Sequence, residues 1–436
     1  MSRIALSRSR LRAVLVDTTP LRADHDFRWL WSGQVVSGIG NQVTRVALPY
    51  QVYVETHSTL AIAALTTVQL LPILVFSLGA GSLADAVDRR RLLAITQVGL
   101  ALCSVALVVL ALQPATPVWA LFVVAFLSAS IGSFDQPARA SAVPRLVPAE
   151  RLQSAIALNQ LNFQTQSIVG PALGGVLIAI VGLAGAYAVD VVSFAASLIA
   201  LTQIRPLPPL VNAVRPSIAA VVEGLRFARA RPLILSTFAI DLNAMILGMP
   251  TSLFPVLALD VFHVGAAGFG LLEAAPAVGA FLGAVASGWV NRIRFVGRAV
   301  IRAVVVWGLA IAAFGAATFS FPLALVLLAI AGAADVLSAV FRSTIVQLAT
   351  PDELRGRVTS LHILVVTSGP RLGDIEAAAA AAVVGPQLAV ISGGLLCVAG
   401  ALVVARIFPQ LGAHVAGAAA GVTDSEEGRG KGIAAA

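Results

Sequence analysis

The sequence has little charge and few of the residues that catalytic and metal sites need. Only 11% of its 436 residues are charged, and it contains two cysteines and five histidines. The histidines and cysteines show no metal-ligand spacing and no phosphate-cradling glycine loop is present, so neither a metal site nor ATP-driven chemistry is expected. The GSLAD run at 81–85 is not a nucleophile elbow, because no strand precedes it. We therefore expect no enzyme activity, no catalytic residues and no cofactor.

The two cysteines do not indicate a disulfide. Cys103 and Cys397 lie in apolar stretches, where a small thiol acts as a packing residue. Arginines interrupt the apolar residues of the first twenty positions, so no cleavable signal peptide is expected there. The chain is strongly hydrophobic, because 58% of its residues are hydrophobic and its mean hydropathy is +0.92. That composition is too apolar for a soluble surface and indicates a membrane protein.

Apolar runs repeatedly reach the roughly 20 residues that a helix needs to cross a bilayer. The sequence therefore predicts an all-α polytopic membrane protein with twelve transmembrane helices. These spans are expected near residues 27–53, 60–83, 91–112, 117–138, 154–181, 184–204, 233–258, 267–290, 299–318, 322–345, 358–383 and 386–407.

Basic residues occupy alternate gaps between these spans. Arginines follow the second, fourth, sixth and eighth spans, and Arg342 is counted with them, whereas the opposite loops hold no Lys or Arg. Arg45 and Arg371 are the only basic residues that lie far from the ends of a span. The positive-inside rule makes the basic side cytoplasmic, with both termini on it. The pI near 10.8 does not indicate nucleic-acid binding, because the charges are dispersed among short loops.

An internal repeat divides the chain. A GSFDQPAR stretch with Asp135 is matched, two hundred residues later, by a GAADVLSAVFR stretch with Asp335. Two six-helix bundles related in this way form a parallel repeat, and a substrate site is expected at their interface near the bilayer midplane. The predicted divisions are a cytoplasmic tail at 1–26, a first bundle at 27–204, a cytoplasmic linker with an amphipathic helix at 205–232, a second bundle at 233–407 and a disordered cytoplasmic tail at 408–436.

The loop between the second and third spans carries the most specific motif. It reads GSLADAVDRRR at 81–91 and resembles the signature loop of the major facilitator superfamily, Gly-x-Leu-Ala-Asp-basic-x-Gly-basic-basic. Ala86 and Asp88 depart from that pattern, because they replace a basic residue and a glycine. The resemblance implies the major facilitator fold and a conformational gate made of Gly81, Asp85, Arg89, Arg90, Asp135 and Arg139.

Within this gate, the resemblance gives specific roles to Asp85, Arg89 and Asp135. They correspond to the aspartate, the arginine and the fourth-span acid of a relay that holds the outward-facing state. Arg90 and Arg91 also fit a simpler role as determinants of topology.

A narrower resemblance covers nearly the whole chain. The VALPYQVYVETHST, IVGPALGGVLI and PDELRGRV stretches look like the branch of the superfamily that contains the enterobactin exporter and drug-efflux proteins. The resemblance implies a bacterial inner-membrane protein, expected as a monomer in lipid, that exports a siderophore or drug in exchange for protons. The alternatives are uptake of a small hydrophilic solute, and a non-transporting membrane receptor or scaffold.

Polar residues inside the spans are costly and indicate a transport pathway. In the first span, Asn41 and Arg45 continue a polar face, and Arg45 lies about 12 Å below the outer end of the span. Glu273 and Asp374 are expected at a comparable depth, so either carboxylate is a candidate partner for Arg45. Arg371 is predicted to line a polar gate next to Pro370, or to form a structural ion pair with Asp335.

Other polar residues have two interpretations each. The fifth span places Asn159, Asn162 and Gln166 on one stripe, which predicts either substrate contact or hydrogen bonding between helices. Asp190 is expected to be a packing residue. Proton coupling needs a carboxylate that changes protonation between states, and the candidates are, in order, Glu273, Asp241 and Asp374.

Overall fold

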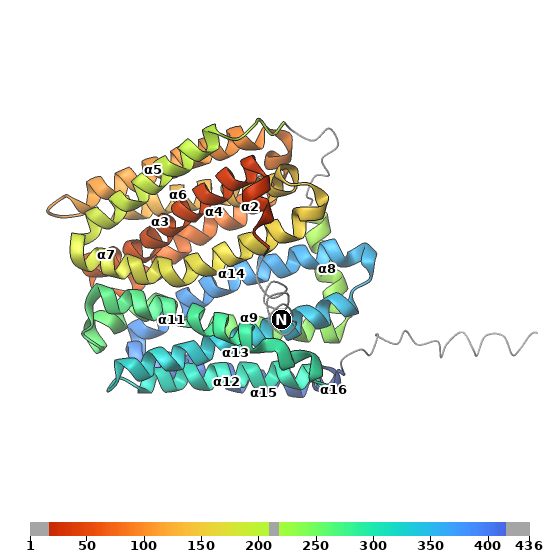
Figure 1. The fold of residues 1–436 in the computed structure, drawn as a ribbon. Helices are drawn as coiled ribbons and strands as arrows, with labels where there is room; N and C mark the ends of the chain where they lie inside the picture. Colours follow the sequence, from red (N-terminus) through yellow and green to blue (C-terminus); the bar gives the residue numbers. More distant parts are fainter. Residues whose placement is uncertain (1–16, 209–217, 416–436) are drawn as a thin grey trace, which may run out of the picture.

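The computed structural model describes residues 17–208 and 218–415, which form helices and no β-strand (Figure 1). The bounds are α2 Thr19–Ala23, α3 His25–Thr56, α4 Thr59–Ala86, α5 Arg89–Ala111, α6 Val118–Leu146, η1 Ala149–Arg151, α7 Leu152–Thr202, α8 Ile218–Ala230, α9 Pro232–Leu247, η2 Thr251–Leu253, α10 Phe254–Val256, η3 Leu257–Val261, α11 Gly265–Val285, η4 Ala286–Arg292, α12 Val296–Ala316, α13 Phe321–Ala349, α14 Asp352–Val384, α15 Pro386–Ile407 and α16 Pro409–Ala413.

Within the described residues, nine helical segments are long and apolar enough to cross a membrane. Two more predicted spans correspond to α3 and α14, which are as long but carry more polar residues. One of the nine covers two predicted spans, because α7 continues past Gly182 without an intervening loop. Gly182 has φ 72° and ψ 179°, a conformation that only glycine adopts readily, and it separates the two halves of α7.

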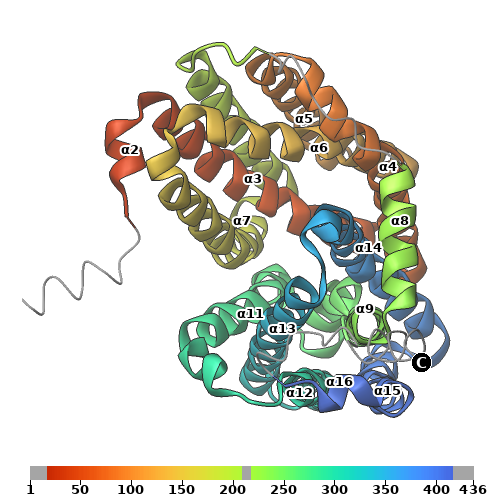
Figure 2. The same ribbon diagram turned by 90° about the vertical axis from the view of Figure 1, so that its right-hand side faces the viewer.

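Contacts between the helices fall into two sets. Helices α3 to α7 pack mainly on one another, and helices α9 to α15 pack mainly on one another. We call these sets the N-terminal and the C-terminal helix group, and Figure 2 shows them side by side. The two groups meet chiefly where α7 packs on α11 and where α4 packs on α14. The predicted linker helix is present as α8, which packs against α9 and α14.

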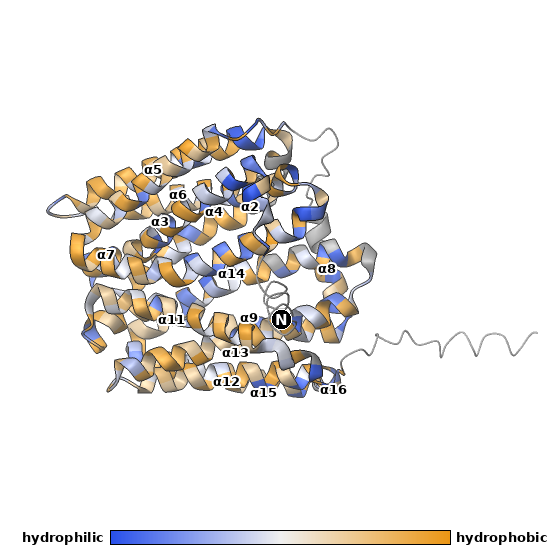
Figure 3. Ribbon diagram, viewed as in Figure 1, coloured by the Kyte–Doolittle hydropathy of each residue, from blue (hydrophilic) through white to orange (hydrophobic). Residues whose placement is uncertain are grey.

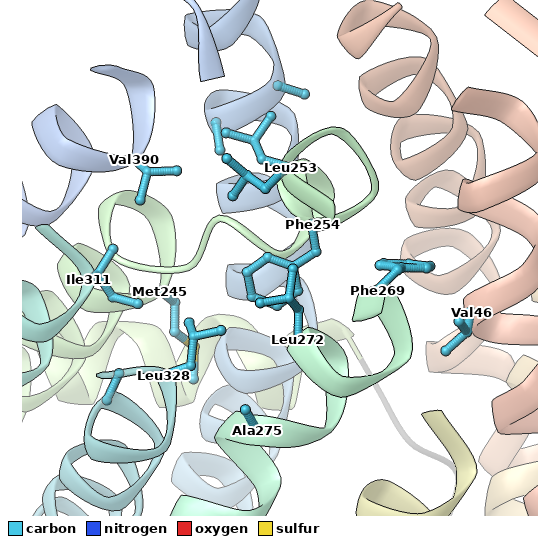
Figure 4. Close-up of a cluster of buried hydrophobic side chains, with 14 of the residues drawn as sticks. Val46, Met245, Leu253, Phe254, Phe269, Leu272, Ala275, Ile311, Leu328 and Val390 are labelled. Carbon is cyan, nitrogen blue, oxygen red and sulfur yellow. The ribbon is translucent and has the colours of Figure 1, made fainter. Parts of the chain in front are cut away.

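The C-terminal group is packed around an apolar cluster beside the end of α9 (Figure 4). Met245, Phe254, Leu272 and Leu328 each expose 7% of their surface or less. Phe254 also contacts Phe314 edge to face, with ring centroids 6.0 Å apart. This cluster fixes α10, α11 and α13 relative to the break that follows α9.

Hydrophilic residues gather at the end of the molecule that carries α2, α8 and α16 (Figure 3). We call this the basic end, because the predicted arginine loops lie there. Arg90, in the first turn of α5, donates hydrogen bonds to the carbonyls of Leu201 and Thr202 at 2.9 and 3.1 Å, so it caps the last turn of α7. Arg90 therefore has a structural contact in addition to any effect on topology.

Two expectations from the sequence need correction at this end. The tail after residue 407 is not disordered throughout, because Pro409–Ala413 form α16 and Leu411 is fully buried. Residues 416–436 lie outside the described part of the chain. Arg342 does not belong to a basic loop, because it lies within α13 and exposes only 3% of its side chain.

Candidate functional site

Four charged side chains from both helix groups meet at the interface of the groups. Arg45 of α3 interacts electrostatically with Glu273 of α11 and with Asp374 of α14. Arg371, one turn before Asp374, interacts with both Arg45 and Asp374. We call these four residues the central charge cluster. It contains two cations and two carboxylates, so its formal charge is balanced. The sequence left Glu273 and Asp374 open as partners of Arg45, and both interact electrostatically with it.

Asp374 also holds a break in a neighbouring helix. The α9 helix ends at Leu247, and helical structure resumes at Thr251. One carboxylate oxygen of Asp374 accepts hydrogen bonds from the hydroxyl of Thr251 and from the backbone N–H of Ser252, the latter at 2.8 Å. The Ser252 hydroxyl donates to the backbone carbonyl of Asp374 at 2.8 Å. Asp374 therefore acts as an N-terminal cap supplied by another helix, at a place where a discontinuous helix exposes backbone groups.

Arg371 connects the two helix groups directly. Its guanidinium donates a hydrogen bond of 2.9 Å to the side-chain oxygen of Gln69 on α4. The alternative ion pair between Arg371 and Asp335 is not formed, because Asp335 interacts with Arg342. Since α14 carries both Arg371 and Asp374, this helix links α4 of one group to the broken helix of the other.

The groups also touch nearer the end opposite the basic end. The Tyr53 hydroxyl of α3 donates to the Asp260 carboxylate of η3. Tyr50 stacks on Phe269 of α11, with ring centroids 5.9 Å apart. Tyr53 lies three residues before the end of α3, and Phe269 lies in the first turns of α11, so these contacts join the groups at that end.

A second set of charges lies inside the C-terminal group. Arg342 of α13 pairs with Asp241 of α9 at 2.6 Å, and the two side chains expose 3% and 1% of their surface. Arg342 also donates a 2.7 Å hydrogen bond to Ser338. Asp335 of α13 interacts electrostatically with Arg342 and Asp241, and His362 of α14 does so with the same two residues. We call Asp241, Asp335, Arg342 and His362 the inner charge cluster.

The predicted gate is described only in part. Asp135 of α6 pairs with Arg139 at 2.5 Å and accepts hydrogen bonds from Thr96 and Gln97 of α5 at 2.7 and 3.2 Å. Arg89 is 1% exposed and donates to Ser141 of α6 at 2.9 Å. The side chains of Gly81 and Asp85 lie outside the described residues. The relay of Asp85, Arg89 and Asp135 therefore stays a prediction.

The amide stripe of α7 faces α3. Gln166 donates to the backbone carbonyl of Gln34 at 3.0 Å and to the Asn162 side chain at 2.7 Å. Asn162 is 4% exposed, whereas Asn41 of α3 is exposed. These contacts match the interpretation of the stripe as hydrogen bonding between helices. For Asn159, whose buried side-chain oxygen accepts no hydrogen bond within the described residues, contact with substrate stays a prediction.

Asp190 is held by hydroxyl groups in the N-terminal group. Its carboxylate accepts hydrogen bonds from Thr44 at 2.6 Å and Ser104 at 2.7 Å, and one from Ser193 at 3.3 Å. It is 1% exposed and joins α3, α5 and α7. This environment agrees with the packing role expected from the sequence.

Sequence reasoning missed several residues of these sites. Gln69 and the Thr251–Ser252 pair were missed because their partners lie more than one hundred residues away, and no local pattern marks them. Arg342 and His362 were missed because both lie near predicted span ends, where charged residues are common. For Arg342 a signal was available, because it follows Asp335 by seven residues. That spacing is about two helical turns and places the two side chains on the same face of the helix.

The chain is similar to known transporters over most of its length. A family model described as transmembrane secretion effector, a branch of the major facilitator superfamily, matches residues 16–419. The enterobactin exporter EntS of Citrobacter koseri is 28% identical over 362 residues, which cover 82% of this chain and 86% of that protein. The corresponding protein of Shigella boydii is 27% identical with the same coverage.

Solved structures agree on the fold. A bacterial homologue of the human lysosomal transporter Spinster, in an inward-facing conformation, superposes with a TM-score of 0.70 at 15% identity, covering 91% of this chain and 99% of the other. A bacterial homologue of the iron transporter ferroportin, in its inward-facing state, gives 0.66 at 17% identity, with 89% and 99% covered.

Proposed function

Because the chain belongs to the transmembrane secretion effector family of major facilitator transporters, we propose that it is a secondary active exporter that exchanges an amphipathic organic compound for protons. Its relatives named as enterobactin exporters support a siderophore as substrate, and a drug-like compound belongs to the same chemical class. The observation that carries the proposal is the central charge cluster, which brings ionisable side chains of both helix groups together at their interface.

The proposed topology has twelve membrane spans in two bundles of six. The two halves of α7 on either side of Gly182 count separately, and the broken segment from α9 to η3 counts as one span. The bundles are 27–204 and 233–407, joined by the 205–232 linker that contains α8. The basic end is placed in the cytoplasm of a bacterial cell, with both termini there, because α2 and α16 lie at that end. The protein is proposed to act as a monomer in lipid, with no nucleic-acid partner.

Transport is proposed to proceed by alternating access. The Tyr53–Asp260 and Tyr50–Phe269 contacts join the groups on the proposed outer side. This arrangement supports a conformation that is closed to the outside and open to the cytoplasm, from which an exported substrate would enter. Opening to the outside would require these contacts and the Arg371–Gln69 hydrogen bond to break. The Asp135–Arg139 pair and its neighbours are the proposed inner gate.

The two alternatives suggested by the sequence have less support. Relatives over four-fifths of the chain are named as exporters, which favours efflux over uptake of a small hydrophilic solute. A non-transporting receptor or scaffold would not need charges from both groups at the interface, where each costs desolvation free energy. We therefore retain export as the proposal.

The direct test is transport in reconstituted inside-out vesicles with an acidic interior. We expect accumulation of enterobactin, of the cationic dye ethidium, or of both, and we expect a protonophore to abolish it. The control is the Arg357→Leu variant, which removes only an exposed ion pair with Glu223 on α8 and should transport normally. Arg45→Gln should lose transport, because it removes a cation from the central charge cluster. Accumulation that persists with the protonophore would contradict proton coupling, and no accumulation of either compound would contradict the proposed substrate class.

A further inference from the structure

The inner charge cluster contains no residue of the N-terminal helix group. Asp241, Asp335, Arg342 and His362 come from α9, α13 and α14, all within the C-terminal group. Asp241 interacts electrostatically with Arg342 and His362. Asp335 interacts with Arg342 and Asp241. These four side chains therefore form one electrostatic unit.

The charges of this unit do not balance. Two carboxylates share one guanidinium, so the unit carries a net negative charge when His362 is neutral. The central charge cluster differs, because Arg45 and Arg371 match Glu273 and Asp374 in number. Asp241 and Arg342 are buried, and Asp335 and His362 are partly buried. The unbalanced charge therefore carries a desolvation penalty, and binding a single proton removes it.

The scarcity of hydrogen-bond donors around Asp241 also favours a bound proton. Apart from its ion pair with Arg342, Asp241 accepts no hydrogen bond at either carboxylate oxygen within the described residues, although it is 1% exposed. Asp190 is equally buried, but three hydroxyl groups donate to it. Donated hydrogen bonds favour an ionised carboxylate, and their absence favours a neutral one. Asp241 therefore lacks the hydroxyl donors that surround Asp190.

We propose that Asp241, Asp335 and His362 share one exchangeable proton, held beside Arg342 inside the C-terminal helix group. A metal ion is the less suitable occupant, because no group of three or more His, Cys, Asp or Glu residues in the described parts of the chain is placed to bind one. The role of this proton in driving transport depends on the proposed function, whereas its binding does not. The site also differs from Glu273, the first coupling candidate from the sequence.

Proton release from the purified protein tests the binding directly and needs no substrate. The protein in detergent is shifted from acidic to alkaline buffer, and a pH dye counts the protons released. We expect Asp335→Asn and Asp241→Asn each to release one proton fewer than the wild type. The double variant should also release one fewer, because the two carboxylates hold the same proton. The control Arg357→Leu, which removes no carboxylate, should release as many as the wild type.

Two results would overturn the proposal. Single variants that release as many protons as the wild type would show that these carboxylates stay ionised, and a double variant that releases two fewer would show two independent sites. Asp335→Asn is the safer variant for folding, because it leaves the Arg342–Asp241 ion pair intact. Its elution on gel filtration and its thermal unfolding midpoint provide the folding check. If Asp241→Asn fails that check, Asp335→Asn and the control Arg357→Leu still decide the question.

Transport then tests the role of the proton. In vesicles, Asp335→Asn should keep substrate exchange but lose accumulation driven by a pH gradient, whereas Arg357→Leu, which removes only an exposed ion pair, should keep both. If the wild type shows no gradient-driven accumulation, the proposed function fails while the proton count still stands. If the wild type accumulates substrate and Asp335→Asn does so equally, the inner charge cluster is not the coupling site.

Discussion

Gly175 in α7 and Gly270 in α11 lie against each other at the crossing of the two helix groups. A β-carbon built on Gly175 would lie 2.8 Å from the Cα of Gly270, and one built on Gly270 would lie 2.9 Å from the Cα of Gly175. Contacts this short involve backbone atoms, which cannot rotate away. The crossing therefore depends on glycine at both positions. Gly174, the neighbouring residue, faces Val43 of α3 within the N-terminal group.

The first prediction concerns this crossing. Gly175→Ala should separate α7 from α11 and favour the conformation open at the end opposite the basic end, because the added methyl group overlaps the α11 backbone. A cysteine reporter at Ala266, which is 7% exposed, should then react faster with a membrane-impermeant maleimide. Gly132→Ala is the matched control, because a β-carbon there meets nothing within 4 Å. Equal labelling of both variants would contradict the prediction.

The second prediction concerns the Tyr53–Asp260 hydrogen bond. Tyr53→Phe should favour the same open conformation roughly fivefold or more, because a hydrogen bond of this kind contributes about 1 kcal/mol or more. The Ala266 cysteine reporter measures the shift. Tyr50→Phe serves as the comparison, since it keeps the ring that stacks on Phe269. A larger effect from Tyr50→Phe than from Tyr53→Phe would argue against a latch at Tyr53.

The third prediction compares a buried ion pair with an exposed one. Arg342→Leu should lower the free energy of unfolding by about 3–5 kcal/mol, because it leaves the Asp241 carboxylate buried without its partner. Arg357→Leu should cost less than about 1 kcal/mol, since Arg357 and Glu223 are 39% and 48% exposed. Denaturant unfolding in detergent measures both. Adding Asp241→Leu to Arg342→Leu should recover part of the loss, and a further decrease would contradict this explanation.

The fourth prediction concerns the cap on the broken helix. Asp374→Ala should lower the free energy of unfolding by about 0.5–2 kcal/mol, because the Thr251 hydroxyl and the Ser252 N–H lose their acceptor. Asp374→Asn should cost less, since its side-chain oxygen still accepts a hydrogen bond. The same unfolding measurement applies, with Glu376→Ala on the same helix as the control. Equal losses for the Asn and Ala variants would indicate that charge, rather than capping, explains the effect.

The sequence predicted the membrane character, the helical spans and the linker helix, because each is encoded locally. A run of apolar residues must avoid water, and its length decides whether it crosses a bilayer. The GSLADAVDRRR loop and the repeat around Asp135 and Asp335 likewise identified the superfamily without any structure. The predicted gap between the spans at 154–181 and 184–204 falls at Gly182, the residue of α7 with non-helical backbone angles.

Partner choice among the buried charges was decided only by the tertiary structure. Depth along a helix limits which residues share a layer, but the rotation of each helix determines which side chains meet. Depth alone allowed Arg371 to pair with Asp335. In the packed helices Asp335 interacts with Arg342 instead, and Arg371 interacts with Gln69 and Asp374. The capping of the α9 break by Asp374 likewise joins residues more than one hundred positions apart, a distance that only packing can close.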